Sequence, residues 1–171
     1  MKILETERLL LRQLAADDAA FILELLNEPA FLQNIGDRGA RTLDDARRYI
    51  ANGPVASYKR FGFGLYLVAL KESGVPIGIC GLLKRETLEH VDIGFALLER
   101  FRSQGYAYES ASAVLDYGCR VLRLQRIVAI TAPHNQASIA LLQKLGLRFE
   151  KTLRLPDHGG ENKLFATVAP Q

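Results

Sequence analysis

The chain runs Phe95-Ala96-Leu97-Leu98-Glu99-Arg100-Phe101-Arg102-Ser103-Gln104-Gly105-Tyr106-Ala107 through the end of a strand, a short basic turn and the start of a helix. The first N–H groups of a helix have no partner within it, and together with the helix dipole they attract an anion such as a phosphate. Gly105 lets the anion approach the backbone because it has no Cβ. An ordinary strand-to-helix turn uses the same residue types, so this stretch alone leaves both interpretations open.

The segments on either side of this turn predict a βαβ unit. Apolar residues indicate strands at 90–98 and 126–131, joined by a helix over about 105–122. Two strands joined in this way should be parallel, with a right-handed crossover. The rest of the chain predicts strands at 8–12, 64–70, 75–83, 147–155 and 162–168, and helices that begin near Asp17 or Asp18, after Thr42 and after Asn135. This order predicts an α/β (α+β) domain with a mixed sheet.

Turn and cap residues mark the boundaries of these elements. Pro29 should stop or bend the first helix, and Gly53-Pro54 should end the second. Thr42 and Asp45 have the spacing of a capping box at the start of that second helix. Asp157–Gly160 is the predicted turn of a final antiparallel pair.

The composition describes one ordinary globular domain. The chain has 171 residues, and no linker or repeat divides it, so we predict a single domain over 1–171. The 22 basic and 19 acidic side chains give a net charge of +3, which is too small to indicate a nucleic-acid partner but suits an anionic cofactor. No apolar run approaches the ~20 residues of a membrane helix. Cys80 and Cys119 form neither a disulfide framework nor a metal-ligand spacing, so a cytoplasmic protein without metal is predicted.

Three blocks of the sequence together resemble a known family. Arg102–Ala107 resembles the Arg/Gln-x-x-Gly-x-Gly/Ala signature of the GNAT superfamily of N-acetyltransferases, and Asn135–Leu147 resembles the helix that follows the next strand in these enzymes. Glu5–Arg12 resembles the opening of the RimJ/RimL branch, which acetylates ribosomal-protein N-termini. The blocks occur in family order over about residues 5–168. The resemblance implies the GNAT fold: a mixed, mostly antiparallel central sheet of about six to seven strands, with a central parallel βαβ unit and about four flanking helices.

The family resemblance also implies an activity. Such enzymes move an acetyl group from acetyl-CoA to a primary amine, of a small molecule or of a protein N-terminus, by direct attack in a ternary complex. An amine with a pKa of ~10 must lose a proton before it attacks. The attack forms an oxyanion that backbone N–H groups can stabilise. Acetyl-CoA is therefore the expected cosubstrate, no metal is required, and a homodimer is expected because relatives are often dimers.

The resemblance assigns cofactor contacts to two stretches and one asparagine. Phe95, Ala96 and Leu97 would lie beside the pantetheine arm, with the N–H of Leu97 or Ala96 near the thioester carbonyl. Asn135 would hydrogen-bond the same arm, although an asparagine here can equally be a helix N-cap. The pyrophosphate would be held by Arg102, Ser103, Gln104, Gly105, Tyr106 and Ala107.

Two polar residues are candidates for proton transfer. Asp92 falls where some members of the family place a catalytic carboxylate, and the alternative is a solvated carboxylate at a strand end. Many relatives carry a tyrosine that protonates the leaving thiolate at the position of Leu142, so that acid is absent here. Ser138 then becomes the candidate for this step, and its alternative is a small helix residue packed under a strand.

The acceptor site should be built from the early helices and the polar loop over 34–41. Asn34, Asp37 and Arg38 are the candidate acceptor-binding residues of this loop, whose simpler interpretation is a solvated connection. Tyr66 could line the same cleft from its strand. His90 is a further candidate because it would share strand parity with Asp92, and hence the same face of the sheet.

Two other functions compete with acetyl transfer. A non-catalytic acyl-CoA-binding module is the alternative, because Leu142 removes one known acid. A Rossmann-like nucleotide protein is disfavoured, since the pattern G-x-G-x-x-G is missing and the phosphate turn comes late in the chain.

Overall fold

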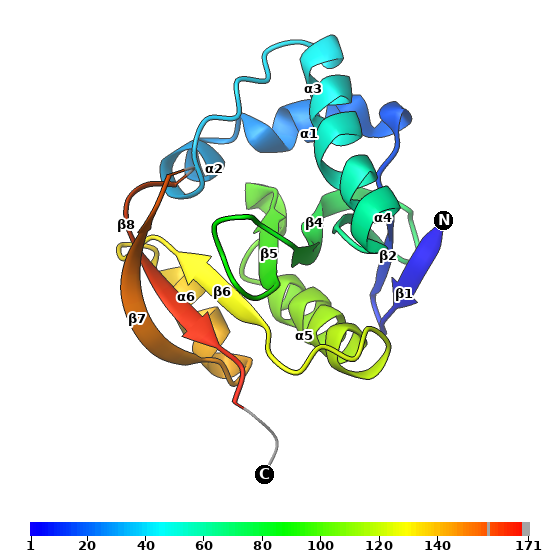
Figure 1. Cartoon of the computed structure of the whole chain (residues 1–171). Coiled ribbons are helices and arrows are strands. Elements are labelled where there is room, and N and C mark those ends of the chain that lie inside the picture. Colours follow the sequence, from blue (N-terminus) through cyan, green and yellow to red (C-terminus); the bar gives the residue numbers. More distant parts are fainter. Residues whose placement is uncertain (157, 169–171) are drawn as a thin grey trace.

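The computed structural model describes residues 1–156 and 158–168, and it contains one sheet of eight strands (Figure 1). The strands follow the spatial order β1-β2-β3-β4-β5-β6-β8-β7. Every neighbouring pair is antiparallel except β5 and β6, which are parallel. The strands are β1 Lys2–Glu5, β2 Leu9–Gln13, β3 Leu65–Leu70, β4 Pro76–Leu83, β5 Asp92–Leu97, β6 Val128–Thr131, β7 Arg148–Leu155 and β8 His158–Ala166.

The sheet confirms the predicted mixed α/β fold and adds one strand to it. All the predicted strands are present, and the additional strand is β1, which pairs with β2 from Lys2 to Glu5. It is an edge strand of 4 residues with exposed ends, too short to show a period-2 pattern. The start of β8 at His158 precedes the predicted start, and Asp157 of the predicted turn lies outside the described residues.

Helices cover both faces of the sheet (Figure 1). Helix α5, Tyr106–Arg120, connects β5 to β6 on one face and is followed there by α6, Gln136–Lys144, which confirms the predicted βαβ unit. The other face carries α1 Ala19–Leu26, α2 Pro29–Asn34 and α3 Leu43–Ile50, while α4 Ala56–Phe61 lies beside the start of β3. Three short turns complete the set: η1 Ala16–Asp18, η2 Ala51–Val55 and η3 Glu99–Phe101. In the part of the chain that the structure describes, no helix is both long and apolar enough to span a membrane.

The apolar core divides between the two faces because side chains of a strand alternate. Val68 and Cys80 are buried on the face that α5 covers, together with Val114 of that helix. Leu67 and Ile79 are buried on the opposite face, against α1 and α3. The sheet is therefore a central layer with an apolar cluster on each side.

Proline positions differ from prediction in one helix. The first helix ends before Pro29 as expected, and Pro29 then begins α2, where a proline costs no hydrogen bond. The prediction that Gly53-Pro54 ends the second helix is wrong: the chain continues through the π turn η2 into α4, which ends at Gly62. Pro54 has no N–H to donate, so the α-helical hydrogen-bond pattern is interrupted there. The chain forms the wider π turn η2 at this point and then continues as a helix. The predicted capping box is confirmed, since the hydroxyl of Thr42 accepts from the N–H of Asp45 at 3.1 Å.

Candidate active site

The sheet opens between β5 and β6. The register pairs these strands only at Asp92 and Val128, where the N–H of Val128 donates to the carbonyl of Val91 at 2.9 Å. Strand β5 stays paired with β4 over its whole length, whereas Figure 1 shows β6 diverging from β5. A cleft of about 140 Å³ lies at this opening and is lined by residues of both strands, of α2 and of α6.

The register decides which backbone groups of β5 face the opening. Antiparallel strands bond through alternate residues. The N–H of Leu98 donates to the carbonyl of Ile77 in β4, whereas the carbonyl of Val91 serves β6. Even-numbered residues of β5 therefore bond to β4. The N–H groups of Phe95 and Leu97 point toward the opening.

The same alternation applies to β6 and to the candidate oxyanion donors. Because Val128 faces β5, Ile130 directs its N–H and carbonyl into the opening as well. Of the two N–H groups predicted near a thioester, that of Ala96 is turned to β4 and that of Leu97 faces the opening. The two strand edges thus offer hydrogen bonds to an extended ligand that carries its own amides.

Behind β5 the chain forms η3 and then turns sharply into α5. Ser103 and Gly105 have left-handed backbone conformations, with φ of 61° and 85°. Helix α5 begins at Tyr106 without a side-chain cap. The first N–H groups of α5 are therefore open to an anion, and successive turns of this kind form anion-binding concavities.

The arginines of this loop point away from the start of α5. Arg102 donates from Nε and Nη2 to the carbonyl of Leu97, at 3.2 and 3.0 Å. Arg100 pairs with Glu24 of α1 at 2.7 Å. Their charges therefore fix the turn to the strand and to the helix on the other face of the sheet.

Arg8 supplies positive charge at the start of α5 instead. Its Nη1 donates to the carbonyl of Gln104 at 3.1 Å, and its guanidinium lies 4.3 Å from the centre of the Tyr106 ring. Glu109 accepts from Arg8 Nε at 2.7 Å and from the hydroxyl of Thr6. Burial raises the pKa of Glu109, but these hydrogen bonds outweigh burial and lower it. Arg8 lies 96 residues before Gln104, so no local pattern could associate it with the loop.

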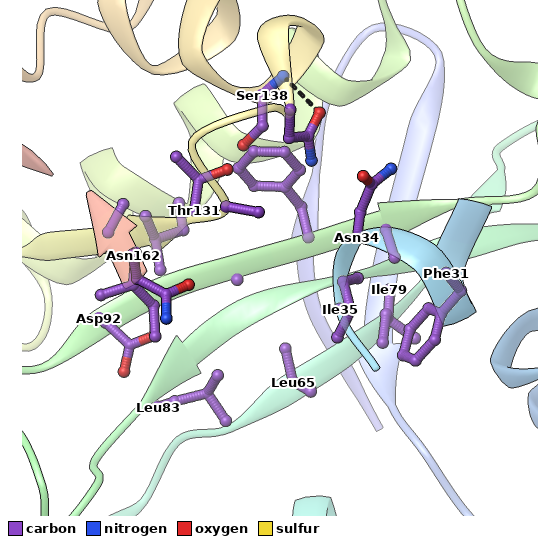
Figure 2. Close-up of a pocket in the computed structure, with 18 of the residues that line it drawn as sticks. Phe31, Asn34, Ile35, Leu65, Ile79, Leu83, Asp92, Thr131, Ser138 and Asn162 are labelled. Atoms are coloured by element: carbon purple, nitrogen blue, oxygen red, sulfur yellow. Dashed lines mark hydrogen bonds between the residues drawn. The ribbon is translucent and has the colours of Figure 1, made fainter. Parts of the chain in front are cut away.

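Helix α6 presents its first turn to the cleft. Asn135 Oδ1 accepts from the N–H of Ser138 at 3.2 Å, a bond dashed in Figure 2, so the N-cap interpretation is confirmed. The cap uses the amide oxygen and leaves the amide NH₂ group for another partner. Asn135, Ser138 and Leu142 all line the cleft, and Leu142 is buried.

Asp92 is buried at the side of the cleft rather than solvated at a strand end. Its side chain is 1% exposed, and its Oδ1 accepts from Arg85 Nε at 3.0 Å. Asn162 of β8 lines the same cleft and is also buried. Sequence reasoning missed Arg85 and Asn162, since both come from segments without a motif. Among the described residues, no group of three or more His, Cys, Asp or Glu side chains could hold a metal ion.

Helix α2 and the loop after it form the wall of the cleft across from Asp92. Phe31, Asn34 and Ile35 line it, and so does Arg38. In Figure 2 the first three lie on the side of the cleft away from Asp92. Asn34 Oδ1 lies 3.1 Å from Nε2 of His134, so the end of α2 contacts the turn before α6.

Two predicted acceptor residues of loops lie outside the cleft. Asp37 is exposed and binds the guanidinium of Arg41 at 2.5 Å. His90 lies in a bend before β5, which begins at Asp92, so the two do not share strand parity. Neither residue is among those that line the cleft.

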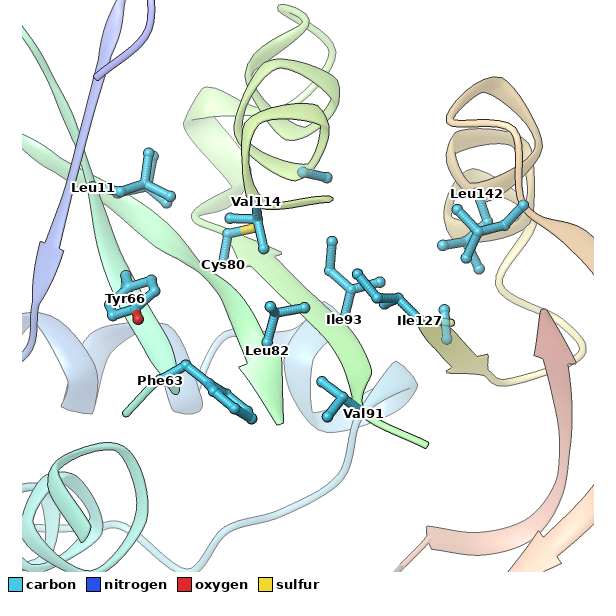
Figure 3. Close-up of a cluster of buried hydrophobic side chains, with 14 of the residues drawn as sticks. Leu11, Phe63, Tyr66, Cys80, Leu82, Val91, Ile93, Val114, Ile127 and Leu142 are labelled. Atoms are coloured by element: carbon cyan, nitrogen blue, oxygen red, sulfur yellow. The ribbon is translucent and has the colours of Figure 1, made fainter. Parts of the chain in front are cut away.

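Tyr66 lies on the wrong face of the sheet to line the cleft. It is 1% exposed and stacks against Tyr58, with ring centres 5.5 Å apart. Figure 3 shows it in the cluster on the α5 face. Leu65, one residue earlier in β3, lines the cleft in its place. In a strand, a shift of one residue moves a side chain to the opposite face.

Comparison with known proteins assigns this geometry to a family. Residues 8–148 match the family model described as the acetyltransferase (GNAT) domain. The chain is 30% identical over 154 residues to an uncharacterized N-acetyltransferase, YoaA, of Bacillus subtilis, over 89% of this chain and 86% of that protein. The crystal structure of an acetyltransferase from Agrobacterium tumefaciens has a TM-score of 0.83 and 25% identity, over 98% of this chain and 94% of that one. RimL, a ribosomal alpha-N-protein acetyltransferase in complex with coenzyme A, has a TM-score of 0.83 and 20% identity, over 99% and 98%.

The chain therefore belongs to the GNAT acetyltransferase family, and the predicted family is confirmed. Its enzyme class is that of an N-acetyltransferase. The shared fold with RimL is consistent with the resemblance of residues 5–12 to the RimJ/RimL branch. A Rossmann-like nucleotide protein is excluded.

Proposed function

We propose that this chain transfers the acetyl group of acetyl-CoA to a primary amine by direct attack in a ternary complex. The observation that carries the proposal is the opening between β5 and β6, which lies between the start of α5 and the cleft. The pantetheine arm of CoA is an extended chain with two amides, so it can add to a free strand edge as a peptide does. Phe95 and Ile130 supply backbone groups for it, whereas the carbonyl of Leu97 accepts from Arg102 and only its N–H faces the opening.

The diphosphate of the cofactor would lie at the start of α5. The open N–H groups of residues 103–107 and the helix dipole favour an anion there. Arg8 adds a guanidinium beside Gly105, whose φ of 85° favours glycine. The guanidinium of Arg8 and the backbone conformation at Gly105 therefore both favour a diphosphate at the start of α5.

The reaction needs an oxyanion donor, a proton acceptor and a proton donor. The amine attacks the thioester carbonyl, the oxyanion forms near the N–H of Leu97, and the C–S bond then breaks to release thiolate. Asp92 is the one carboxylate among the described residues that line the cleft, so it would take the ammonium proton directly or through water. Ser138 would hydrogen-bond or protonate the thiolate, because Leu142 carries no acid.

Calorimetric titration with acetyl-CoA tests the binding step. Gly105→Glu places a carboxylate where the diphosphate should lie, and we expect it to abolish measurable binding. Gly74→Glu is the matched control, because Gly74 also has a left-handed backbone, with φ of 75°, but lies in an open hairpin turn away from the cleft. It should bind like the parent protein. Equal heats from all three proteins would contradict the proposal.

Release of free thiol from acetyl-CoA in the presence of a panel of amines tests the transfer step. We expect at least one amine to accelerate release well above the blank without amine. That blank also subtracts the constant signal of Cys119, which is exposed. Binding of acetyl-CoA without release by any amine would favour the acyl-CoA-binding module instead.

A further inference from the structure

We propose that the acceptor is a small primary amine that carries a carboxylate, such as an amino acid, and that Arg38 binds the carboxylate. The inference rests on the proposed acetyl transfer and specifies its second substrate. Three features of the cleft support it: a guanidinium to which the described residues offer no salt bridge, an excess of positive charge among those residues, and a small, partly apolar space.

Arg38 differs from the arginines that follow it in the chain. Arg41 pairs with Asp37 at 2.5 Å, and Arg47 pairs with Asp44 at 2.6 Å. In the described part of the chain Arg38 has no salt bridge, and it lines the cleft. A guanidinium binds a carboxylate through two parallel hydrogen bonds, which is the contact that this position leaves available.

The described residues of the cleft carry more positive than negative charge. Arg38 and Arg85 are its cations, and Asp92, its carboxylate, already binds Arg85 at 3.0 Å. Tyr49 lies close to both guanidinium groups: burial raises the pKa of its hydroxyl, and the charges of Arg38 and Arg85 act in the opposite direction. Among the described residues of the cleft, the charge of Arg85 is offset by Asp92 and that of Arg38 is not, so a ligand carboxylate would be attracted to Arg38.

The shape of the cleft fits a small acceptor. The contact of 3.1 Å between Asn34 and His134 joins the end of α2 to the turn before α6, beside the cleft that Asn34 lines. Its volume of about 140 Å³ is close to the roughly 150 Å³ that accepts a molecule of benzene's size.

Apolar side chains line the side of the cleft away from Asp92. Phe31, Ile35 and Ile79 lie together in Figure 2, and Asp92 lies apart from them. The hydrocarbon part of an amino acid would pack on this apolar surface, with its amine directed to the thioester and Asp92. The carboxylate would then face Arg38.

Initial rates of thiol release with acetyl-CoA and matched acceptors test the inference. The panel holds α-, β- and γ-amino acids, the carboxamide of each, and dipeptides that begin with the same residue. For the best amino acid we expect kcat/KM about tenfold to a hundredfold above that of its carboxamide, as a charge-assisted hydrogen-bond pair provides. Arg38→Gln should remove this preference, because it should lower kcat/KM for the amino acid far more than kcat/KM for the carboxamide. Arg47→Gln, an exposed arginine of α3 outside the cleft, should keep the preference.

Three outcomes overturn the inference, and they differ in what they say about the enzyme. Equal or faster acetylation of carboxamides or dipeptides by the parent protein would overturn the carboxylate as the recognised group and leave the acetyl transfer standing. The same holds if Arg38→Gln lowers the rates with acid and amide equally. If no amine of any kind causes thiol release, the proposed function is overturned as well.

Discussion

Asp92 and Arg85 meet at the side of the cleft, with Oδ1 and Nε 3.0 Å apart. A buried carboxylate keeps its charge when a guanidinium offsets the hydration that it has lost. Asp92 can therefore act on the acceptor as a base, or it can act indirectly by holding Arg85 in place. These two roles predict different effects on kcat when Asp92 is replaced and when Arg85 is replaced.

We expect Asp92→Asn to lower kcat by about 10²–10⁴-fold, the usual range for loss of a general base, with the Kd for acetyl-CoA unchanged. Arg85→Gln keeps the carboxylate and removes only its partner, so it should lower kcat much less. Steady-state rates and calorimetric Kd values for both variants provide the test. Equal losses of kcat in the two variants would show that Asp92 only positions Arg85, and a weaker Kd would place it on the cofactor instead.

At this scale the sequence predicts a side chain well where its neighbours in the chain define its surroundings. Asn135 could be read as a cap because Ser138 follows at the right spacing. Arg8 could not be read as part of the phosphate loop, since its partner Gln104 is brought to it by the pairing of distant strands. Tyr66 was assigned to the cleft by chain alternation alone, and alternation does not say which of the two faces carries the cleft.

The contact between the β1–β2 turn and α5 belongs to the scale of elements. Glu109 in the first turns of α5 accepts hydrogen bonds from Thr6 and from Arg8, so one carboxylate ties the start of the sheet to the start of the helix. Burial opposes the charged form, and these bonds outweigh it, so the pKa of Glu109 is lowered from its ordinary value of 4.5. The contact therefore stabilises the fold while Glu109 is ionised.

A lowered pKa in the folded state gives stability that is present above the unfolded pKa and is lost as pH falls through the folded pKa. Glu109→Gln should thus reduce Tm at pH 7 by about 3–10 °C, from ~1.5–3 kcal/mol for charged hydrogen bonds in a chain of this size. The difference from the parent protein should shrink once pH falls below the ordinary 4.5. Thermal unfolding from pH 7 to 3 measures it, with Glu72→Gln in the exposed hairpin as control. A difference that is constant over this range would refute the role of the charge.

Elements were predictable where they carry a long pattern and were missed where they do not. The 15 residues of α5 show a clear helical stripe, whereas the 4 residues of β1 show none. Pro54 predicts the end of a helix, because a proline breaks the α-helical bond pattern. Val55 of η2 and Tyr58 and Phe61 of α4 are partly buried against the apolar clusters, and this packing favours continuation of the helix past Pro54 through a π turn.

At the scale of the whole molecule, the cleft is assembled from parts that are distant in the chain. Its cofactor side follows local motifs, because a phosphate loop and a helix start are each encoded within a few residues. Its acceptor side depends on α2 packing across the opening. The contact of Asn34 with His134, 100 residues apart, is the kind of feature that no local pattern encodes.

The opening in the sheet predicts an alternating pattern of amide hydrogen exchange along β5. The N–H groups of Phe95 and Leu97 face the opening and should exchange fast in the free protein, whereas those of Gly94 and Ala96 bond to β4 and should be protected. Ile130 in β6 should behave like Phe95. If the pantetheine arm adds to these edges, saturating acetyl-CoA should slow exchange at Phe95, Leu97 and Ile130 and leave Gly94 and Ala96 unchanged.

Residue-resolved amide exchange, measured by NMR with and without acetyl-CoA, tests this alternating pattern and its change on binding. Strand β3 is the internal control, because it is paired on both edges: Leu67 and Val68 should both be protected in either state. Slowing of every amide in β5 to the same extent would indicate a general stabilisation by mass action rather than contact with the strand edge. Slow exchange at Phe95 and Leu97 already in the free protein would mean that the sheet is closed in solution, and the pantetheine arm could not then bind as proposed.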